Sequence, residues 1–337
     1  MTLFMKKAAA LITLAVMVFC VFAAGHSETV QLPETPVIGI AWRPDTDSEF
    51  FANICRAVEE AGGIWIMLDQ VRLPDLAYTP EGKLTEGVAE TGALDSIAAK
   101  YIRCNTWHGS NAAEAVGNVR CVLFTGGEDV SPSLYYQPEE CHGIEEERDY
   151  NAERDISDYL TMAYCLDNDI PVMGFCRGMQ MLGVISGAEF IQDIPTFFKQ
   201  QGLEYQYQHR NQKATPESYR DYASHEVQLK SGGIARDIFG TEKLTGCPSW
   251  HHQAILNVDN TRLIVTGTTE VNGIQMIEVV ERTDKNFAVG FQFHPEAAVV
   301  KNLDNTENKV HYMDYETAMK IFDWLMQQIS EPLEDAA

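Results

Sequence analysis

Cys176 lies where a short apolar run changes into helix-forming residues, in the stretch "PVMGFCRGMQMLG" (171–183). A sharp turn from strand to helix pushes the side chain at the turn out of the carboxyl edge of a sheet, where crevices form in open α/β folds. Gly174 and Gly178 tolerate the crowding that such a turn creates. Because the amino terminus of the following helix favours a thiolate over a thiol, this turn predicts a cysteine nucleophile. A buried structural cysteine ahead of a helix is the alternative.

The segment "VGFQFHPEAA" (289–298) supplies the base that a thiolate nucleophile requires and a group to orient that base. His294 follows an apolar strand, and Pro295 stiffens the turn that leads to Glu296. A carboxylate held there can accept from one imidazole nitrogen while the other nitrogen faces the thiol. A surface His-Pro-Glu without a catalytic role is the alternative, and the cysteine turn in the same chain argues against it.

The segment "LFTGGEDVSPSLY" (123–135) places two glycines directly after a buried strand. The backbone of such a turn can approach a ligand and point an N–H at it. The N–H of Gly127, together with that of Arg177 at the cysteine turn, would form a two-donor oxyanion hole. A simple turn is the alternative, because Gly-Gly after a strand is common.

The elements that must position these groups alternate between strand and helix through the first half of the chain. The strands are short apolar runs, and the helices carry apolar residues at helical spacing. This alternation predicts an α/β fold with a mainly parallel central sheet and helices on both faces. Strands are expected at 36–42, 64–69, 118–127 and 170–175, and helices at 49–63, 153–169 and 177–187.

The second half consists mostly of short strands without helices between them, which predicts antiparallel strands added to the parallel core. Strands are expected at 225–230, 254–258, 262–269, 273–281 and 287–293, and a closing helix at 315–329. Two long segments, 71–117 and 194–222, are weakly patterned. Such segments are functional lids or disordered excursions, and the pattern does not choose between these.

Four motifs together, "GFCRGMQ", "FTGGEDVSP", "SWHHQAI" and "GFQFHPE", resemble those of the class I glutamine amidotransferase-like hydrolases. The branch that the chain is most similar to is the gamma-glutamyl-gamma-aminobutyrate hydrolases, relatives of the gamma-glutamyl hydrolases among the cysteine peptidases. "ERD" (153–155), "FIQDI" (190–194), "SHEV" (224–227) and "HHQAI" (251–255) are softer signs of that branch. The resemblance covers residues 36–330 and implies one hydrolase domain of flavodoxin-like fold.

The resemblance implies hydrolysis of γ-glutamyl amide bonds through a glutamyl-thioester, with release of glutamate and an amine or amino acid. No metal and no organic cofactor is implied. It also implies that a glutamine one helical turn after the nucleophile positions the glutamyl group and that the "SWHHQAI" strand borders the pocket. The implied roles are Cys176 as nucleophile, His294 as general base and acid, Glu296 as orienting carboxylate, Gly127 and Arg177 as oxyanion hole, and Gln180, His252 and Gln253 as substrate-binding residues.

Two departures from the family pattern bear on which substrates enter. The segment 71–117 is longer than expected between the second and third strands, and Thr125 stands where a proline often precedes the glycine turn. From the residues themselves, adjacent histidines on a strand point to opposite faces, so a metal site made by His251 and His252 is not expected.

Three other functions stay open. A glutaminase domain that hands ammonia to a partner would share the triad, but such domains usually serve a fused or dedicated synthase in the cytosol. A non-catalytic binding protein on the same fold would not need the triad. Action on γ-linked peptides of the cell wall is suggested only by the leader described below.

Residues 1–25 have the pattern of a secretory signal, with Lys6 and Lys7 ahead of the chargeless run "AAALITLAVMVFCVFAA". We therefore expect export after cleavage, to the periplasm or the medium, and an uncleaved anchor is the alternative. The 337 residues carry a formal charge of -24, which argues against a nucleic-acid partner. The expected partner is a small γ-glutamyl substrate, with no membrane contact of the mature form and a homodimer left open.

The chain has 8 cysteines and no Cys-x-x-Cys pair, which argues against a zinc knuckle or a thioredoxin-type motif. Cys121, in "VRCVLF", is interpreted as a buried strand residue. The polar surroundings of Cys104, Cys141 and Cys247 make these three the better candidates for disulfides in an oxidising compartment, and the pairing is not readable from the sequence.

Overall fold

The computed structural model describes residues 36–142, 145–213, 215, 221–304 and 312–330, all within the compact unit Thr35–Ala337. The secretory signal expected at residues 1–25 lies outside the described residues. Within these described ranges, no helix is both long enough and apolar enough to cross a membrane.

A nine-stranded sheet forms the centre of the fold, with strand order β2-β1-β3-β4-β11-β10-β9-β6-β7. The first five strands of this order run parallel, and the remaining four continue the sheet by antiparallel pairing. The strands are β1 (Val37–Ile40), β2 (Ile64–Met67), β3 (Cys121–Phe124), β4 (Val172–Phe175), β6 (Ala223–Leu229), β7 (Lys243–Ser249), β9 (Leu263–Val271), β10 (Ile274–Arg282) and β11 (Ala288–Phe291). This arrangement confirms the predicted α/β class.

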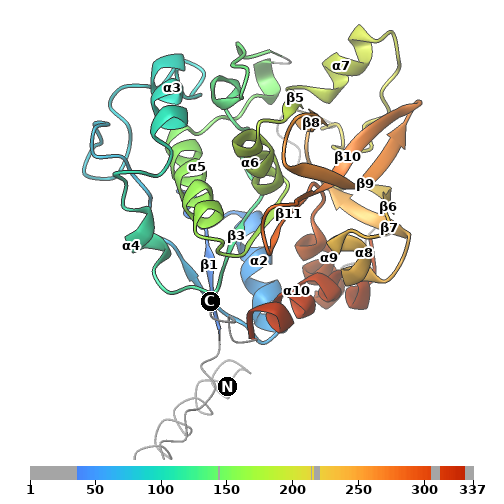
Figure 1. The fold of residues 1–337 in the computed structure, drawn as a ribbon. Coiled ribbons are helices and arrows are strands. Elements are labelled where there is room, and N and C mark those ends of the chain that lie inside the picture. Colours follow the sequence, from blue (N-terminus) through green and yellow to red (C-terminus); the bar gives the residue numbers. More distant parts are fainter. Residues whose placement is uncertain (1–35, 143–144, 214, 216–220, 305–311, 331–337) are drawn as a thin grey trace, which may run out of the picture. The chain divides into compact units, whose positions relative to one another are not determined.

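Helices cover both faces of the parallel part of the sheet (Figure 1). The α-helices are α2 (Glu49–Glu60), α3 (Ser96–Asn105), α4 (Ala112–Val116), α5 (Ala152–Asp167), α6 (Arg177–Ser186), α7 (Ile194–Gln200), α8 (Ile234–Phe239), α9 (Pro295–Leu303) and α10 (Tyr315–Ser330). Helices α5 and α6 lie on one face, and α2, α9 and α10 lie on the other.

The two hydrophobic cores follow from the alternation of side chains along each strand. In β3, Val122 and Phe124 point into the core under α5 and α6, while Cys121 and Leu123 point into the core under α2 and α10. Cys121 is fully buried, so the interpretation of this residue as a small core hydrophobe is confirmed.

Several elements differ from the sequence-based expectation. Segment 71–117 contains the helices α3 and α4, and Asp95 begins α3 by accepting from the N–H groups of Ile97 and Ala98. The strand β8 (Ala254–Asn257) does not join the main sheet but pairs with β5 (Glu189–Ile191) in a separate two-stranded sheet. Strand β7 is not among the expected strands, because its Gly246 and Pro248 are poor strand formers.

The expectation for Cys247 is wrong. This cysteine is fully buried within β7 rather than in a loop. The described cysteines are all free thiols, namely Cys55, Cys104, Cys121, Cys141, Cys165, Cys176 and Cys247.

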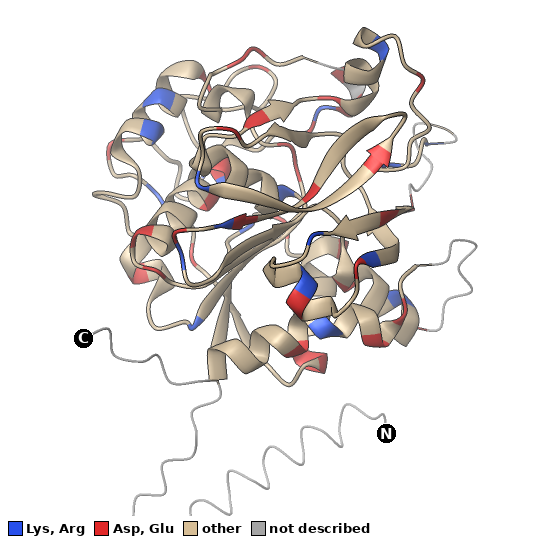
Figure 2. Cartoon of the chain, turned by 45° about the vertical axis from the view of Figure 1, so that its right-hand side comes forward, with Lys and Arg blue, Asp and Glu red and all other residues tan. Residues whose placement is uncertain are grey.

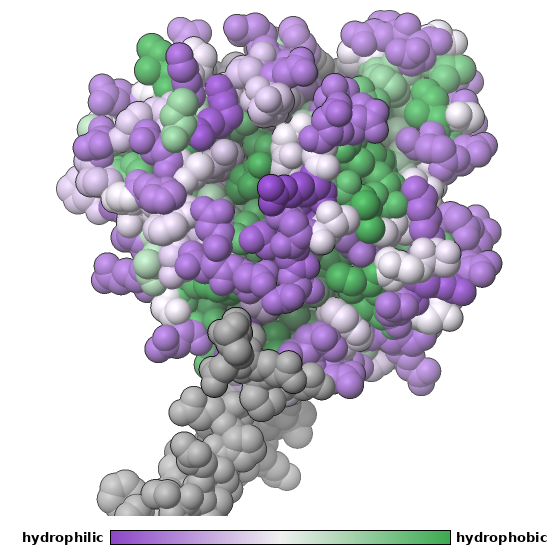
Figure 3. Space-filling model, viewed as in Figure 1, coloured by the Kyte–Doolittle hydropathy of each residue, from purple (hydrophilic) through white to green (hydrophobic). Residues whose placement is uncertain are grey.

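The surface reflects the excess of acidic over basic residues. Acidic residues are distributed along helices, strands and loops, with basic residues between them (Figure 2). The face shown in Figure 3 mixes hydrophilic areas with smaller hydrophobic ones.

Candidate active site

Cys176 occupies the turn between β4 and α6, as the sequence predicts. Its φ of 50° and ψ of -104° are unusual for a residue with a side chain, and such strain is typical of functional turns. Its N–H donates to the carbonyl of Phe291 at 2.7 Å, which holds the turn to β11. The strand–helix pair packs so closely that a Cβ on Gly178 would lie 2.4 Å from the carbonyl oxygen of Phe124. Only glycine fits at that position.

His294 and Glu296 form a hydrogen-bonded pair directly after β11. The imidazole Nδ1 of His294 donates to the Oε1 of Glu296 at 2.6 Å, and both side chains are fully buried. Burial lowers the pKa of His294, but the charges of Glu296 and Cys176 outweigh burial and raise this pKa to about 10. The Nε2 of His294, the ring nitrogen not used by Glu296, has no hydrogen-bond partner among the described residues. The turns that follow β4 and β11 therefore bring the cysteine close enough to influence the pKa of the imidazole.

Gly127 lies beside Cys176 in the wall of a shared pocket, and Arg177 is the first residue of α6. The φ of Gly127 is +145°, and a Cβ there would lie 2.0 Å from Nη1 of Arg154. The N–H of a first helical residue has no acceptor within its own helix. The N–H of Arg177 therefore has no helical acceptor. Gly127 lines the pocket but Arg177 does not, so the two-donor oxyanion hole stays a prediction.

A buried ion-pair network supports the glycine turn. Arg154 donates to the side chain of Glu128 and, through Nη2, to the carbonyl oxygen of Gly126 at 2.9 Å. Arg177 pairs with Asp155 at 2.8 Å and with Asp158 at 3.2 Å. Burial opposes ionisation of Glu128, but the two arginines outweigh burial and lower the pKa of this carboxyl to about 2. The "ERD" motif thus supplies Arg154 and Asp155, whereas no signal in the sequence marks Asp158.

His252 is fixed between two carboxylates. Its Nε2 lies 2.9 Å from Oδ1 of Asp129, and its Nδ1 lies 3.1 Å from Oδ1 of Asp193. Burial lowers the pKa of His252, but Asp129 and Asp193 outweigh burial and raise this pKa to about 9. The imidazole can therefore carry a positive charge in the wall of the pocket.

Gln180 and Gln253 are both held by internal hydrogen bonds. Gln180 donates through Nε2 to the carbonyl of Gln253 at 3.1 Å and lies in the pocket wall. The amide of Gln253 accepts from the N–H of Val130 at 2.9 Å and donates to the carbonyl of Val130 at 3.3 Å. Gln253 lies behind the pocket rather than in its wall, so the structure brings Gln180 and His252 to the ligand space but not Gln253.

The pocket above Cys176 has a volume of ≈ 350 Å³ and a wall with charges of both signs. Its cationic members are Arg43, Arg210, Lys213 and His252, and its acidic members are Asp45, Glu128, Asp129, Glu147 and Asp149. Phe50 and Trp250 add aromatic surface, and the Trp250 carbonyl lies 3.8 Å from the Cys176 Sγ. A small zwitterionic ligand would find partners for both its amino and its carboxylate group. Arg43, Arg210 and Lys213 were not expected in the pocket, because each is distant in the chain from the motifs that predicted the site.

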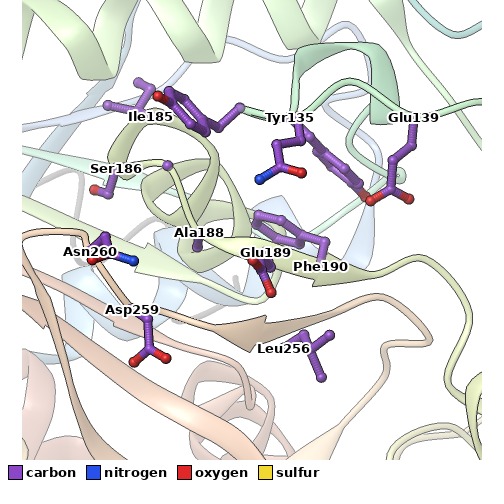
Figure 4. Close-up of a pocket in the computed structure, with 13 residues that line it drawn as sticks. Tyr135, Glu139, Ile185, Ser186, Ala188, Glu189, Phe190, Leu256, Asp259 and Asn260 are labelled. Carbon is purple, nitrogen blue, oxygen red and sulfur yellow. The ribbon is translucent and has the colours of Figure 1, made fainter.

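A second pocket is larger, at ≈ 620 Å³, but contains none of the predicted catalytic groups. It lies at the carboxyl end of α6, where Ser186, Ala188 and Phe190 line it together with Leu256 (Figure 4). The smaller pocket is the candidate active site because Cys176 opens into it.

The chain is similar to a known family and to several known proteins. The family model described as Peptidase C26 matches residues 85–296. Protein NtpR of Enterococcus hirae is 26% identical over 64% of this chain and 78% of its own length. Gamma-glutamyl-gamma-aminobutyrate hydrolase PuuD of Escherichia coli strain K12 is 27% identical over 50% of this chain and 60% of its own length. The crystal structure of a glutamine amidotransferase from Thermotoga maritima has a TM-score of 0.41 and 18% identity, and covers 88% of this chain and 98% of that one.

Proposed function

This chain belongs to the Peptidase C26 family, and on that premise we propose that it hydrolyses γ-glutamyl amide bonds through Cys176. The coarser assignment, a glutamine amidotransferase-like hydrolase, follows from the family and from its relatives. The observation that carries the finer proposal is the strained cysteine turn on the strand next to the one that leads to the buried His294–Glu296 pair.

The first half of the proposed reaction acylates the enzyme. His294 takes the proton of the Cys176 thiol, and the sulfur attacks the δ-carbonyl carbon of the γ-glutamyl group. The resulting oxyanion accepts hydrogen bonds from the N–H groups of Gly127 and Arg177, and one such donor stabilises the transition state by about 3 kcal/mol. His294 then protonates the amide nitrogen, the C–N bond breaks and the amine leaves.

The second half releases glutamate. His294 takes a proton from a water molecule, and the hydroxide adds to the thioester carbon against the same two N–H groups. The C–S bond then breaks, and the proton returns from His294 to the sulfur. Glu296 holds the tautomer of His294 through the 2.6 Å hydrogen bond during both halves.

The charged wall of the pocket supports a γ-glutamyl substrate in particular. The α-carboxylate and the α-ammonium of a glutamyl group lie on the same carbon and have opposite charges. Arg210 and Lys213 offer partners to the first, while Asp129 and Asp149 offer partners to the second. The leader-like segment 1–25 leads us to propose further that the enzyme acts outside the cytosol.

The test is release of glutamate from glutamine, γ-glutamyl-aminobutyrate, a γ-glutamyl dipeptide and a poly-γ-glutamate. Wild type and Cys104→Ala, which changes an exposed cysteine outside the pocket, are expected to release glutamate from at least one non-glutamine substrate. Cys176→Ala is expected to release none. Release from glutamine alone would point to an ammonia-supplying domain, and no release from any substrate would leave a binding protein on this fold.

A further inference from the structure

Three histidines and one glutamate meet in the interior beside the pocket. His225 is on β6, Glu278 is on β10, His251 follows β7, and His209 lies in the segment between α7 and β6. All four side chains are buried, and each offers one ligand atom such that these atoms lie within 4.8 Å of one another. None of the four belongs to the proposed triad.

The ligand atoms of this cluster lack hydrogen-bond partners. In the part of the chain that the structure describes, neither ring nitrogen of His209, the Nε2 of His225, the Nε2 of His251 nor either carboxylate oxygen of Glu278 has one. Glu278 lies 3.3 Å from Nδ1 of His209 and 3.6 Å from Nε2 of His225, but without the geometry of a hydrogen bond. Buried polar atoms are rarely left in this condition without a ligand to satisfy them.

His225 on β6 and His251 after β7 are already oriented as metal ligands usually are. The Nδ1 of His225 lies 3.2 Å from the carbonyl oxygen of Glu226, and the Nδ1 of His251 lies 2.9 Å from that of Gln253. A carbonyl at Nδ1 places the proton there and leaves the lone pair on Nε2. Both Nε2 atoms therefore present lone pairs to the cluster centre.

We propose that His209, His225, His251 and Glu278 bind one divalent transition-metal ion, of which Zn²⁺ is the best match. Three imidazole nitrogens and one carboxylate oxygen are borderline ligands that suit Zn²⁺ and not Ca²⁺ or Mg²⁺. Four ligands from the protein fill a tetrahedral site, which is the pattern of structural rather than catalytic zinc. The carboxylate also offsets part of the charge of the ion within the interior.

The sequence predicts no metal at His251 and His252, because neighbouring side chains on a strand diverge. The premise is wrong, because both histidines lie in the connection between β7 and β8 rather than on a strand. The two rings nevertheless diverge, since His252 lies between Asp129 and Asp193 while His251 joins the cluster. The additional ligands come from β6, β10 and the segment after α7, which are far from His251 in the chain.

The ion would connect the antiparallel part of the sheet to the wall of the pocket. His251 lies between Trp250 and His252, and His209 precedes Arg210; Trp250, His252 and Arg210 all line the pocket. A ligand bond to His209 would fix the irregular segment that carries Arg210. His251 itself also lines the pocket, so the site would hold substrate-binding groups in place from the wall of the pocket.

The experiment is metal analysis of the full purified protein, followed by Zn²⁺ and Co²⁺ titration of protein stripped with a chelator. Wild type is expected to bind one ion per chain, and Co²⁺ is expected to give the intense visible absorption of a tetrahedral site. His225→Ala and Glu278→Gln each remove a ligand and are expected to weaken Zn²⁺ binding by more than about 100-fold. His108→Ala, an exposed histidine outside the cluster, serves as the matched control and is expected to bind as wild type does.

Two results would overturn the proposal. The first is a stripped wild-type protein that remains folded by circular dichroism and takes up no Zn²⁺ at equimolar concentration, which would leave a purely polar cluster. The second is a Co²⁺ spectrum that is the same in wild type and in a folded His225→Ala or Glu278→Gln protein, which would place the ion elsewhere. Neither readout depends on enzymatic activity, so failure of the γ-glutamyl hydrolase proposal would not affect it.

Discussion

At the scale of single residues, the balance between burial and charge decides the properties of the base. Burial opposes a positive charge on His294, yet the carboxylate 2.6 Å away and the neighbouring cysteine raise its pKa to about 10. An imidazole of this basicity can take the proton of a thiol. The pair also affects stability, because the raised pKa of His294 in the folded state stabilises the fold at low pH. That stabilisation is complete below the unfolded value of 6.5 and is lost as the pH rises through about 10.

Removing the carboxylate should weaken both functions of His294. We expect Glu296→Gln to lower kcat by about 10²–10⁴-fold, because the tautomer of the imidazole is no longer held. The alkaline limb of the pH profile of kcat/KM should also move to lower pH, because the charge that raises the pKa of His294 is gone. A pH series of initial rates measures both effects.

Glu270→Gln is the control for this variant, because Glu270 is an exposed carboxylate on β9. Its profile should match that of wild type. An unchanged alkaline limb in Glu296→Gln would show that another group titrates there.

At the scale of elements, the site is assembled by three neighbouring parallel strands. The sheet order places β3, β4 and β11 side by side, and each strand ends in one part of the site. Gly127 follows β3, Cys176 follows β4 and His294 follows β11. The carboxyl ends of parallel strands meet at one edge of a sheet, so groups far apart in the chain come together there. The close contact of α6 with β3 and β4 fixes the position of the turn that carries Cys176.

The closeness of that contact predicts the effect of added volume in α6. We expect Gly178→Ala to destabilise the fold by about 1–3 kcal/mol, because its Cβ would lie 2.4 Å from the Phe124 carbonyl oxygen, which belongs to a rigid strand. Gly183→Ala is the comparison within the same helix, since its added Cβ would meet only side-chain atoms, the Cδ1 of Ile255 at 2.7 Å and the Cζ of Phe190 at 2.9 Å.

Urea denaturation of the two variants and wild type measures this difference. Gly183→Ala should have the smaller effect, because the side chains of Ile255 and Phe190 can shift more easily than a strand backbone and because alanine favours a helix. Equal losses at the two positions would contradict the proposed role of the backbone contact.

At the scale of the whole molecule, the hydrophobic cores stabilise the folded state and the net charge destabilises it. Two hydrophobic cores on opposite faces of the sheet hold the parallel layer together. The formal charge is -24, so the excess acidic side chains repel one another, and this repulsion lowers the stability of the folded state. Salt screens such repulsion over a Debye length of about 10 Å at 0.1 M.

Salt should therefore stabilise this protein. We expect the Tm to rise by a few degrees between about 10 mM and about 300 mM NaCl, because screening reduces the repulsion among acidic side chains. Differential scanning calorimetry measures the shift. A fall in Tm with salt would instead show that local ion pairs, such as those of Arg56 with Asp304, dominate.

The sequence by itself determined the groups that can react and the local turns that present them. Cys176 between two glycines, His294 and Glu296 on either side of Pro295, and the Gly-Gly turn are short-range signals, because the backbone of a few residues defines each one. The alternation of strands and helices likewise predicted the parallel layer, because the spacing of apolar residues within each short segment indicates whether it is a strand or a helix.

Only the tertiary structure decided which of these groups meet. The order β3-β4-β11, the buried pairs of Arg154 and Arg177, and the cluster of His209, His225, His251 and Glu278 all join segments that are distant in the chain. No period or spacing in the sequence encodes such contacts, because they arise when packed elements bring their side chains to one place. The same reason explains why Gln253, which shares a motif with His252, turns its amide to Val130 behind the pocket.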